Sequence, residues 1–171
     1  WVQELALTPA QRRTLRDQVE WNAREENKFY RYDYYRDNCS TRVRDALDLA
    51  TGGAIRRALG GRPTGTSYRS HTRRLTAGDP ATYTGIQLAL GRPADAPIDA
   101  WEESFLPVRF MAHARRIPLA GENGALVPLV AAERQLFAAE RPPEREAPPT
   151  RWPAFLAAGL ALGGALAALG R

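Results

Sequence analysis

The sequence predicts an α+β domain followed by a transmembrane helix at the C-terminal end. Helix-capping patterns recur along the chain, while an alternating aromatic stretch and a Gly-containing turn between apolar runs predict strands. A segment of 18 residues without charge, from Pro153 to Gly170, predicts the membrane helix. With 171 residues, 44% hydrophobic and 25% charged, the chain is long enough for one ordinary domain with an attached segment. This composition excludes a wholly disordered chain and a polytopic membrane protein.

The first expected helix begins at Thr8, which forms a capping box with Gln11. Pro9 would occupy the first helical position, where proline is well tolerated. Leu15 and Val19 continue the helical spacing, so the pattern predicts a helix to about residue 23.

An aromatic stretch follows at residues 28–38, KFYRYDYYRDN. Tyr30, Tyr32 and Tyr34 stand two positions apart, which is the period of an extended strand with one aromatic face. The prediction here is a strand and then a tight turn.

The next helix is expected to begin after Asn38, a good N-cap residue, in the segment NCSTRVRDALDLATGG. Apolar residues recur at helical spacing from residue 43 to residue 50, and Gly52 and Gly53 would end the helix. An Arg- and Gly-rich loop is expected at residues 56–70.

Shorter elements are expected in the second half of the chain. A weakly amphipathic piece spans residues 83–90, and a GRPADAP turn follows it. Asp99 with Glu102 predicts another helix cap, and Pro107 would separate two short helices. Residues 116–130, RIPLAGENGALVPLV, predict two short strands around a Gly-containing turn.

The C-terminal segment has the length and flanks of a membrane span. At a helical rise of about 1.5 Å per residue it would be roughly 27 Å long, close to the thickness of a bilayer hydrocarbon core. Trp152 and Arg151 precede the segment and Arg171 follows it, which suits an interfacial aromatic side chain and snorkelling cations. The alternative is a buried Ala-rich helix, but a Pro-rich linker at residues 141–152 separates the segment from the expected domain, residues 1–140.

Cys39 is the single cysteine, and it is expected at the first position of the helix that Asn38 caps. The positive end of the helix dipole and the nearby Arg42 and Arg44 would favour the thiolate, which is the nucleophilic form. Backbone N–H groups of the first turn could stabilise an oxyanion. The alternative is a small buried hydrophobic residue. Asp37 and Asp45 could orient a base or simply form ion pairs with the two arginines.

A cysteine nucleophile requires a general base, and His71 and His113 are the two histidines of the sequence. His71 lies in SYRSHTRRL and is a candidate base, although a solvated loop position is the alternative. His113 lies in a helical FMAHARR segment, where a structural role is expected.

The segments YRYDYYRDNCSTRVRDALD and TGIQLALGRPADAPIDAWEESFLPVRF resemble the Lnb N-terminal periplasmic domain of bacterial envelope proteins. The resemblance covers roughly Leu5 to Val130. It implies a fold similar to circularly permuted papain-like thiol enzymes, of which this chain would be a fragment. In those enzymes an Asn-Cys pair opens the catalytic helix, so Cys39 corresponds to the nucleophile. Asn38, Ser40, Asp37 and Arg42 are then the supporting residues.

The resemblance also implies a reaction, which is the acylation of the amino-terminal cysteine of a lipoprotein with a phospholipid as acyl donor. The soluble domain is expected in the periplasm, attached to the bacterial inner membrane. The catalytic histidine of the permuted order precedes the cysteine in a Gly-His motif on an early strand. No such motif occurs in these 171 residues, so the chain is expected to begin after that histidine and to be inactive in isolation.

Two other functions remain open at this stage. A thiol hydrolase of lipid or cell-wall material would form the same thioester. A non-enzymatic basic domain would bind acidic lipid headgroups through arginines 56, 57, 62, 69, 73 and 74. Nucleic acid is not an expected partner, because residues 1–150 carry a net charge of only +3, from 22 basic and 19 acidic residues. No cluster with metal-ligand spacing and no phosphate-binding glycine motif is present, so the sequence indicates no cofactor.

Overall fold

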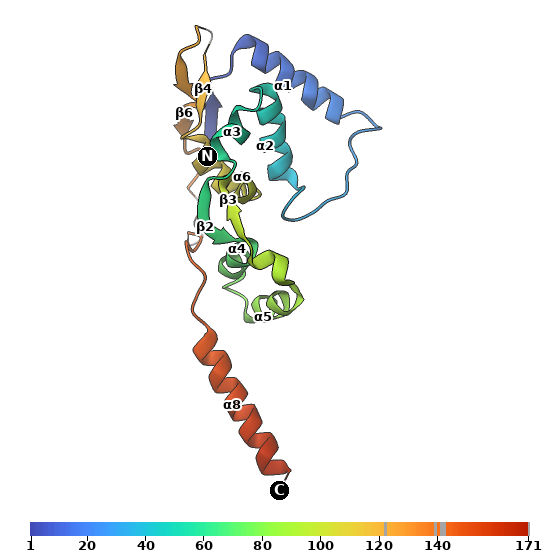
Figure 1. Cartoon of the computed structure of the whole chain (residues 1–171), viewed down its shortest axis with the longest axis vertical. Helices are drawn as coiled ribbons and strands as arrows, with labels where there is room; N and C mark the ends of the chain where they lie inside the picture. Colours follow the sequence, from blue (N-terminus) through green and yellow to red (C-terminus); the bar gives the residue numbers. More distant parts are fainter. Residues whose placement is uncertain (122, 139, 141–142, 171) are drawn as a thin grey trace. The chain divides into compact units, whose positions relative to one another are not determined.

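The computed structural model describes residues 1–121, 123–138, 140 and 143–170 (Figure 1). The helices are α1 (Pro9–Asn22), α2 (Cys39–Ala50), α3 (Ala54–Leu59), α4 (Tyr68–Leu75), α5 (Pro80–Ala89), α6 (Ala100–Glu103), α7 (Pro107–Ala114), α8 (Trp152–Leu169) and the 3₁₀ turn η1 (Arg92–Asp95). The strands are β1 (Val2–Leu5), β2 (Pro63–Ser67), β3 (Pro97–Asp99), β4 (Pro118–Ala120), β5 (Leu126–Pro128) and β6 (Val130–Arg134). The expected α+β class is confirmed.

The chain forms two compact units. Unit 1 comprises Trp1–Tyr68 and Arg92–Pro142, and unit 2 comprises Arg69–Gly91 and Pro143–Arg171. Residues 69–91, which the sequence places within the expected domain 1–140, therefore group with the C-terminal segment. Positions 141 and 142 of the expected linker, and Arg171, lie outside the described residues.

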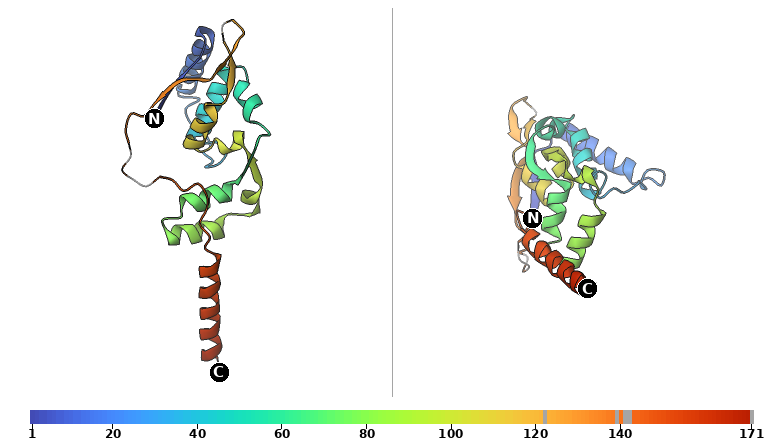
Figure 2. Two further views of the ribbon diagram at one scale, coloured as in Figure 1. Left: turned by 90° about the vertical axis from the view of Figure 1, so that its left-hand side faces the viewer. Right: turned by 60° about the horizontal axis from the view of Figure 1, so that its bottom comes forward.

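The strands of unit 1 form short antiparallel pairs. β1 pairs with β6, from Val2 opposite Arg134 to Leu5 opposite Val130, and Figure 2 shows these blue and orange strands side by side. β2 pairs with β3, and β4 pairs with β5. The β4–β5 pair confirms the expected hairpin, whereas no pattern in the sequence predicted the β1–β6 pair.

The core of unit 1 lies between α2, α3, α6, α7 and the β4–β5 hairpin. Its most deeply buried side chains are Ile55, Leu59, Phe105, Ile117, Leu119 and Leu129. α1 packs against α2 through a partly buried Leu15, while no residue of α1 is fully buried.

The capping motifs of the sequence are present as expected. Thr8 and Gln11 form the capping box of α1, with Pro9 as its first residue. Asp99 and Glu102 form the capping box of α6, and Pro107 begins α7 after a short break. These motifs are local, because each side chain reaches a backbone group only three residues away.

The strand expected within residues 28–38 is wrong, whereas the tight turn expected before α2 is present. Asp33 Oδ1 accepts hydrogen bonds from the backbone N–H groups of Tyr35 and Arg36, each at 2.9 Å, and so closes an Asx-type turn in the middle of the segment. The backbones of Asp33 and Asp37 then bond to each other as an isolated bridge. An aspartate at the centre of the aromatic stretch therefore bends the chain where the alternating pattern predicted extension.

The expected loop at residues 56–70 is also wrong. The side chains of Ile55 and Leu59, four positions apart, are completely buried, which stabilises one face of α3. Gly61 and Gly65 have positive φ angles of 70° and 71°, and β2 forms around Gly65. The high arginine content therefore indicated a loop where the chain forms α3, a helix whose apolar face consists of only a few residues.

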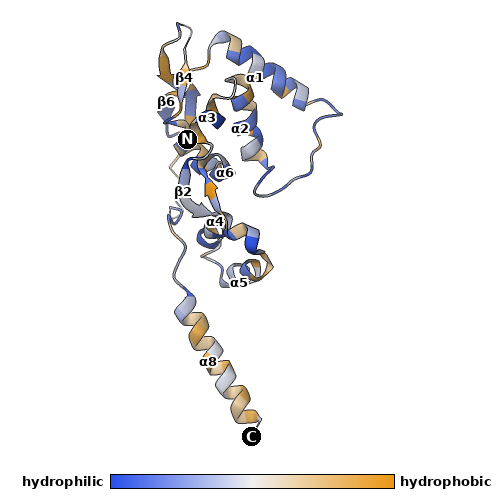
Figure 3. Cartoon of the chain, viewed as in Figure 1, coloured by the Kyte–Doolittle hydropathy of each residue, from blue (hydrophilic) through white to orange (hydrophobic). Residues whose placement is uncertain are grey.

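Unit 2 contains α5, α8 and α4 from Arg69 onward. α8 has a mean hydropathy of 1.7 over 18 residues and none of it is buried among the described residues, which favours the candidate membrane span over the alternative of a core helix. Figure 3 shows apolar residues along most of α8. In the part of the chain that the structure describes, α8 is the one helix long and apolar enough to cross a membrane.

Candidate functional site

Cys39 is the first residue of α2, and its side chain is exposed to solvent. The alternative of a small buried hydrophobic residue is therefore wrong. Within the described residues, the backbone N–H groups of Cys39 and Ser40 have no hydrogen-bond acceptor. The N–H of Thr41, by contrast, donates to Asn38 Oδ1 in the capping interaction. The thiol thus lies beside two backbone donors at the positive end of a helix dipole.

Asn38 holds this helix end in place. Its Oδ1 accepts from the Thr41 N–H at 2.9 Å, and Thr41 Oγ1 accepts from the Asn38 N–H at 2.8 Å, which forms a capping box. Its Nδ2 donates to the carbonyls of Tyr34, at 2.8 Å, and Phe105, at 3.0 Å. One buried side chain therefore joins the preceding turn, the helix and the chain between α6 and α7.

Ser40 adds a second anchor from the helix to the chain after α6. Its Oγ donates to the carbonyl of Ser104 at 2.8 Å, and both side chains are buried. Cys39 stands between the buried Asn38 and Ser40, so it is the side chain of this turn that faces outward.

Arg42 and Arg44 each face a carboxylate. Arg42 binds both oxygens of Asp37, at 2.6 and 2.8 Å, and this hydrogen bonding raises the pKa of the guanidinium. Arg44 is buried, pairs with Asp45 at 2.7 Å and donates to the Trp101 carbonyl at 2.7 Å. The positive charges expected beside the thiol are therefore neutralised, and the simpler interpretation of the two aspartates as ion-pair partners is confirmed.

An aromatic cluster lies next to the start of α2. The rings of Tyr34 and Tyr35 contact the ring of Phe105 edge to face, with centroids 6.0 and 5.4 Å apart, and Tyr68 joins them. By contrast, Phe29 and Tyr32 are 79% and 58% exposed. The end of the aromatic stretch therefore contacts the Phe105 ring, although Tyr34 itself is 52% exposed.

His71, the sequence-derived candidate base, lies on α4 in unit 2 and is 1% exposed. Its Nδ1 accepts a hydrogen bond from Arg74 Nε at 3.0 Å. The alternative of a solvated loop residue is wrong, since the side chain is buried in a helix. Cys39 belongs to unit 1, so the two residues lie in different units.

His113 lies on α7 in unit 1, the helix position that the sequence predicted. Its Nε2 is 2.7 Å from Oε2 of the buried Glu103, and Thr66 Oγ1 donates to the other carboxylate oxygen at 3.3 Å. The sequence analysis did not predict this pair, because residues ten positions apart on two short helices share no periodic pattern. Glu103 directly precedes Ser104, whose carbonyl binds Ser40.

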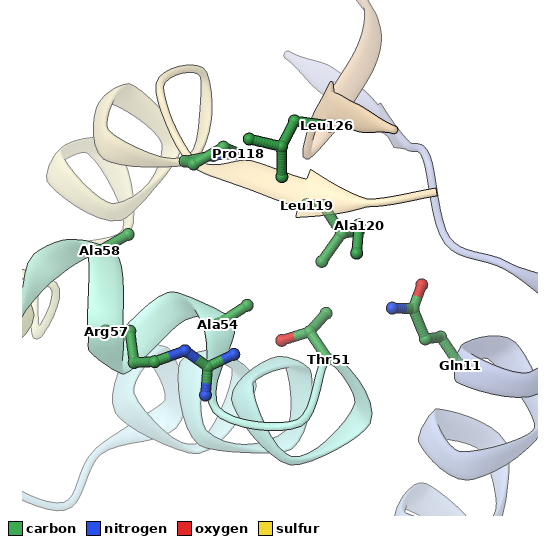
Figure 4. Close-up of a pocket in the computed structure, with 9 residues that line it drawn as sticks. All are labelled: Gln11, Thr51, Ala54, Arg57, Ala58, Pro118, Leu119, Ala120 and Leu126. Atoms are coloured by element: carbon green, nitrogen blue, oxygen red, sulfur yellow. The ribbon is translucent and has the colours of Figure 1, made fainter. Parts of the chain in front are cut away.

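A separate cavity in unit 1, shown in Figure 4, has a volume of about 320 Å³. It is enclosed by α1, the α2–α3 turn and the β4–β5 hairpin. Gln11, Thr51 and Arg57 supply its polar side chains, and Leu119 and Leu126 are among the apolar ones. Arg57 belongs to the arginines that the sequence offers for lipid headgroups, whereas Cys39, His71 and the supporting residues predicted for catalysis do not line this cavity. Across the described residues, no three His, Cys, Asp or Glu side chains group in a way that could hold a metal ion.

Fold and site define an α+β protein with an exposed cysteine at a capped helix end and a candidate membrane-spanning helix at its C-terminal side. Residues 1–74 match the model of the Lnb N-terminal periplasmic domain, so the resemblance is confirmed for this part of the chain. The match includes α2 with Cys39. The second resembling segment, residues 84–110, lies outside it. No curated protein and no solved structure matches the chain.

Proposed function

We propose that the protein is an envelope acyltransferase that moves an acyl chain from a phospholipid through a thioester at Cys39 to an amine. The observation that carries the proposal is the exposed Cys39 beside the two unoccupied N–H groups of the α2 N-terminus. The periplasmic family match and the candidate membrane helix support a substrate drawn from the envelope. The amine is that of the N-terminal cysteine of a lipoprotein, and the membrane is the inner membrane.

In the first half-reaction the Cys39 thiolate attacks the carbonyl carbon of the phospholipid ester. A C–S bond forms, and the carbonyl oxygen becomes an oxyanion that accepts hydrogen bonds from the N–H groups of Cys39 and Ser40. Collapse of this intermediate breaks the ester C–O bond. The lysophospholipid leaves as an alcohol after taking up a proton, and the acyl group stays on sulfur.

In the second half-reaction the amine nitrogen attacks the thioester carbon. The C–N bond forms and the C–S bond breaks, so the thiolate is regenerated and the amine loses one proton. Splitting the transfer into two steps lets one oxyanion site serve both.

Both histidines have partners within their own units: His71 Nδ1 accepts from Arg74, and His113 Nε2 pairs with Glu103. Of these two histidines, His113 shares unit 1 with Cys39, and its helix α7 is in contact with α2.

The decisive experiment is intact mass spectrometry of the membrane-reconstituted protein after incubation with phospholipid, with and without hydroxylamine. We expect an added mass of one acyl chain that hydroxylamine removes and that Cys39→Ser lacks. An acceptor peptide with an N-terminal cysteine should then remove the adduct and gain an amide. Release of free fatty acid without acylated peptide would favour a hydrolase, and no adduct in early-quenched samples would contradict both reactions.

A further inference from the structure

Unit 2 contains a cavity of about 350 Å³ between α4, α5 and the first turn of α8. Polar side chains and apolar or aromatic side chains both line it. The polar residues are Arg69, Arg73, Thr84 and Gln87, and the others are Tyr83, Leu88, Trp152 and Phe155. None of them takes part in the proposed chemistry at Cys39.

The cavity lies where the candidate membrane helix begins. The rings of Tyr83 and Phe155 stack at 6.3 Å and 13°, which holds α5 against the first turn of α8. Arg151, just before α8, lies with its guanidinium 4.8 Å from the centre of the Tyr83 ring. Trp152 is mostly exposed, as expected of an aromatic side chain at the headgroup level of a bilayer. The cavity therefore lies at the N-terminal end of the candidate membrane helix.

Two arginines at this place carry charges that no carboxylate of the described residues neutralises. Arg73 donates to the Tyr83 hydroxyl at 2.9 Å and to the Pro149 carbonyl at 3.5 Å. Arg151 donates to the carbonyl of Ala77. Arg74, by contrast, is paired with Glu144 at 3.0 Å. Arg73 lines the cavity, whereas Arg151 lies next to the lining, against the ring of Tyr83. Two guanidinium groups held by neutral partners near apolar side chains favour an anion that also carries an apolar part.

Gln87 provides a further unoccupied donor. Its Oε1 is 3.4 Å from Arg69 NH1, while its Nε2 is buried with no hydrogen-bond acceptor in the described part of the chain. A buried donor without an acceptor destabilises a protein, so an acceptor oxygen supplied by a ligand would offset that cost.

We propose that this cavity binds the phosphodiester headgroup of an anionic membrane phospholipid. Arg73 and Arg151 neutralise the phosphate, and the acyl chain lies along Phe155 and Leu88, whose side chain is 84% exposed. Arginine matches phosphate oxygens in geometry, and the adjoining membrane presents this ligand at the right depth. The site holds α5 to the membrane surface and does not depend on the proposed acyl transfer.

The test uses the full chain in nanodiscs of phosphatidylcholine with a small fraction of photoactivatable phosphatidylglycerol. After irradiation, we expect labelled peptides from residues 80–89 and 152–160. An equal fraction of photoactivatable phosphatidylcholine should label them several-fold less. Excess inorganic phosphate should not compete, because the acyl chain contributes to binding; full competition would identify a free-phosphate site and overturn the lipid assignment.

Three variants make the test specific. Arg73→Gln should reduce labelling about fivefold, the effect of losing one cation near an anionic headgroup. Arg13→Gln removes the same charge from an exposed position of α1 and should leave labelling unchanged. Because Arg73 also supports Tyr83, Thr84→Asp provides a second arm: it keeps that hydrogen bond and places a repelling carboxylate in the cavity.

The proposal would be overturned by equal labelling of three variants: Arg73→Gln, Thr84→Asp and Arg13→Gln. It would also be overturned if the phosphatidylglycerol and phosphatidylcholine probes labelled the protein equally. Cys39→Ala should label like the unmodified protein. Failure of lipid binding and failure of acyl transfer are therefore distinguished, since the first is read from crosslinks and the second from the thioester.

Discussion

Asn38 Nδ2 donates a hydrogen bond to the carbonyl of Phe105, 67 residues further along the chain. The same side chain caps α2 through the N–H of Thr41. The helix end that carries Cys39 is thus held in place by a contact between distant parts of the sequence, and its stability depends on this one amide.

We expect Asn38→Ala to lower the free energy of unfolding by about 2–3 kcal/mol, because it removes a cap and leaves buried carbonyls without a donor. Urea titration of the detergent-solubilised protein measures this loss. Asn27→Ala is the matched control: its amide donates to the Trp21 carbonyl at an exposed position, so the loss should stay below about 1 kcal/mol. Equal effects of the two substitutions would contradict a special role for Asn38.

Arg44 and Arg42 lie two residues apart on α2 but differ in burial. The Arg44 guanidinium lies 3.8 Å from the centre of the Trp101 ring and binds the carbonyl of the same residue, whereas Arg42 forms a partly exposed pair with Asp37. Arg44→Met should cost about 2–3 kcal/mol because a buried carbonyl loses its donor, and Arg42→Met less than about 1 kcal/mol. Urea titrations that rank the two variants in the opposite order would refute this assignment.

Acid should weaken the β1–β6 pair through Glu133. Hydrogen bonds from Arg115 and then Gln3 lower the pKa of the Glu133 carboxyl from 4.5 to about 2. Because the folded-state pKa is depressed, the stabilisation is complete above about pH 4.5 and is lost as the pH falls toward 2. Melting temperatures between pH 6 and pH 2 should show this loss.

Glu133→Gln should have a smaller fall in melting temperature over the same pH range, because the titrating group is gone. Glu4→Gln on the neighbouring strand is the control and should keep the fall of the unmodified protein. An unchanged pH profile in Glu133→Gln would show that another group causes the acid sensitivity.

Membrane attachment should depend on the apolar character of α8. Leu162→Arg places a charge near the middle of the helix, which costs about 2.5–3.5 kcal/mol of insertion free energy. We expect the variant to be extracted from membranes by alkaline carbonate, while the unmodified protein stays in the pellet. Val19→Arg, at an exposed position of α1, is the control and should also stay in the pellet. Retention of Leu162→Arg in the pellet would contradict a single-span anchor.

The capping boxes of α1, α2 and α6 and the composition of α8 could be predicted from sequence because each depends on residues within one or two turns. Asn38 and Thr41 are three positions apart, and so are Asp99 and Glu102. The position of Cys39 at a helix start follows from the same local information. Its exposure does not, because that depends on which neighbours fold over it.

Contacts between distant residues needed the tertiary structure. β1 pairs with β6, and Glu4 lies opposite Ala132, which is 128 residues further along the chain. No local pattern in the sequence predicts that pairing. Tyr30 and Tyr32 have the period of a strand, yet without a neighbouring strand the Asp33 turn prevails. The burial of His71 and the contact between Glu103 and His113 have the same cause. The packing of several short helices, which sequence spacing does not determine, decides which polar groups are buried away from water and therefore need a hydrogen-bond partner within the protein.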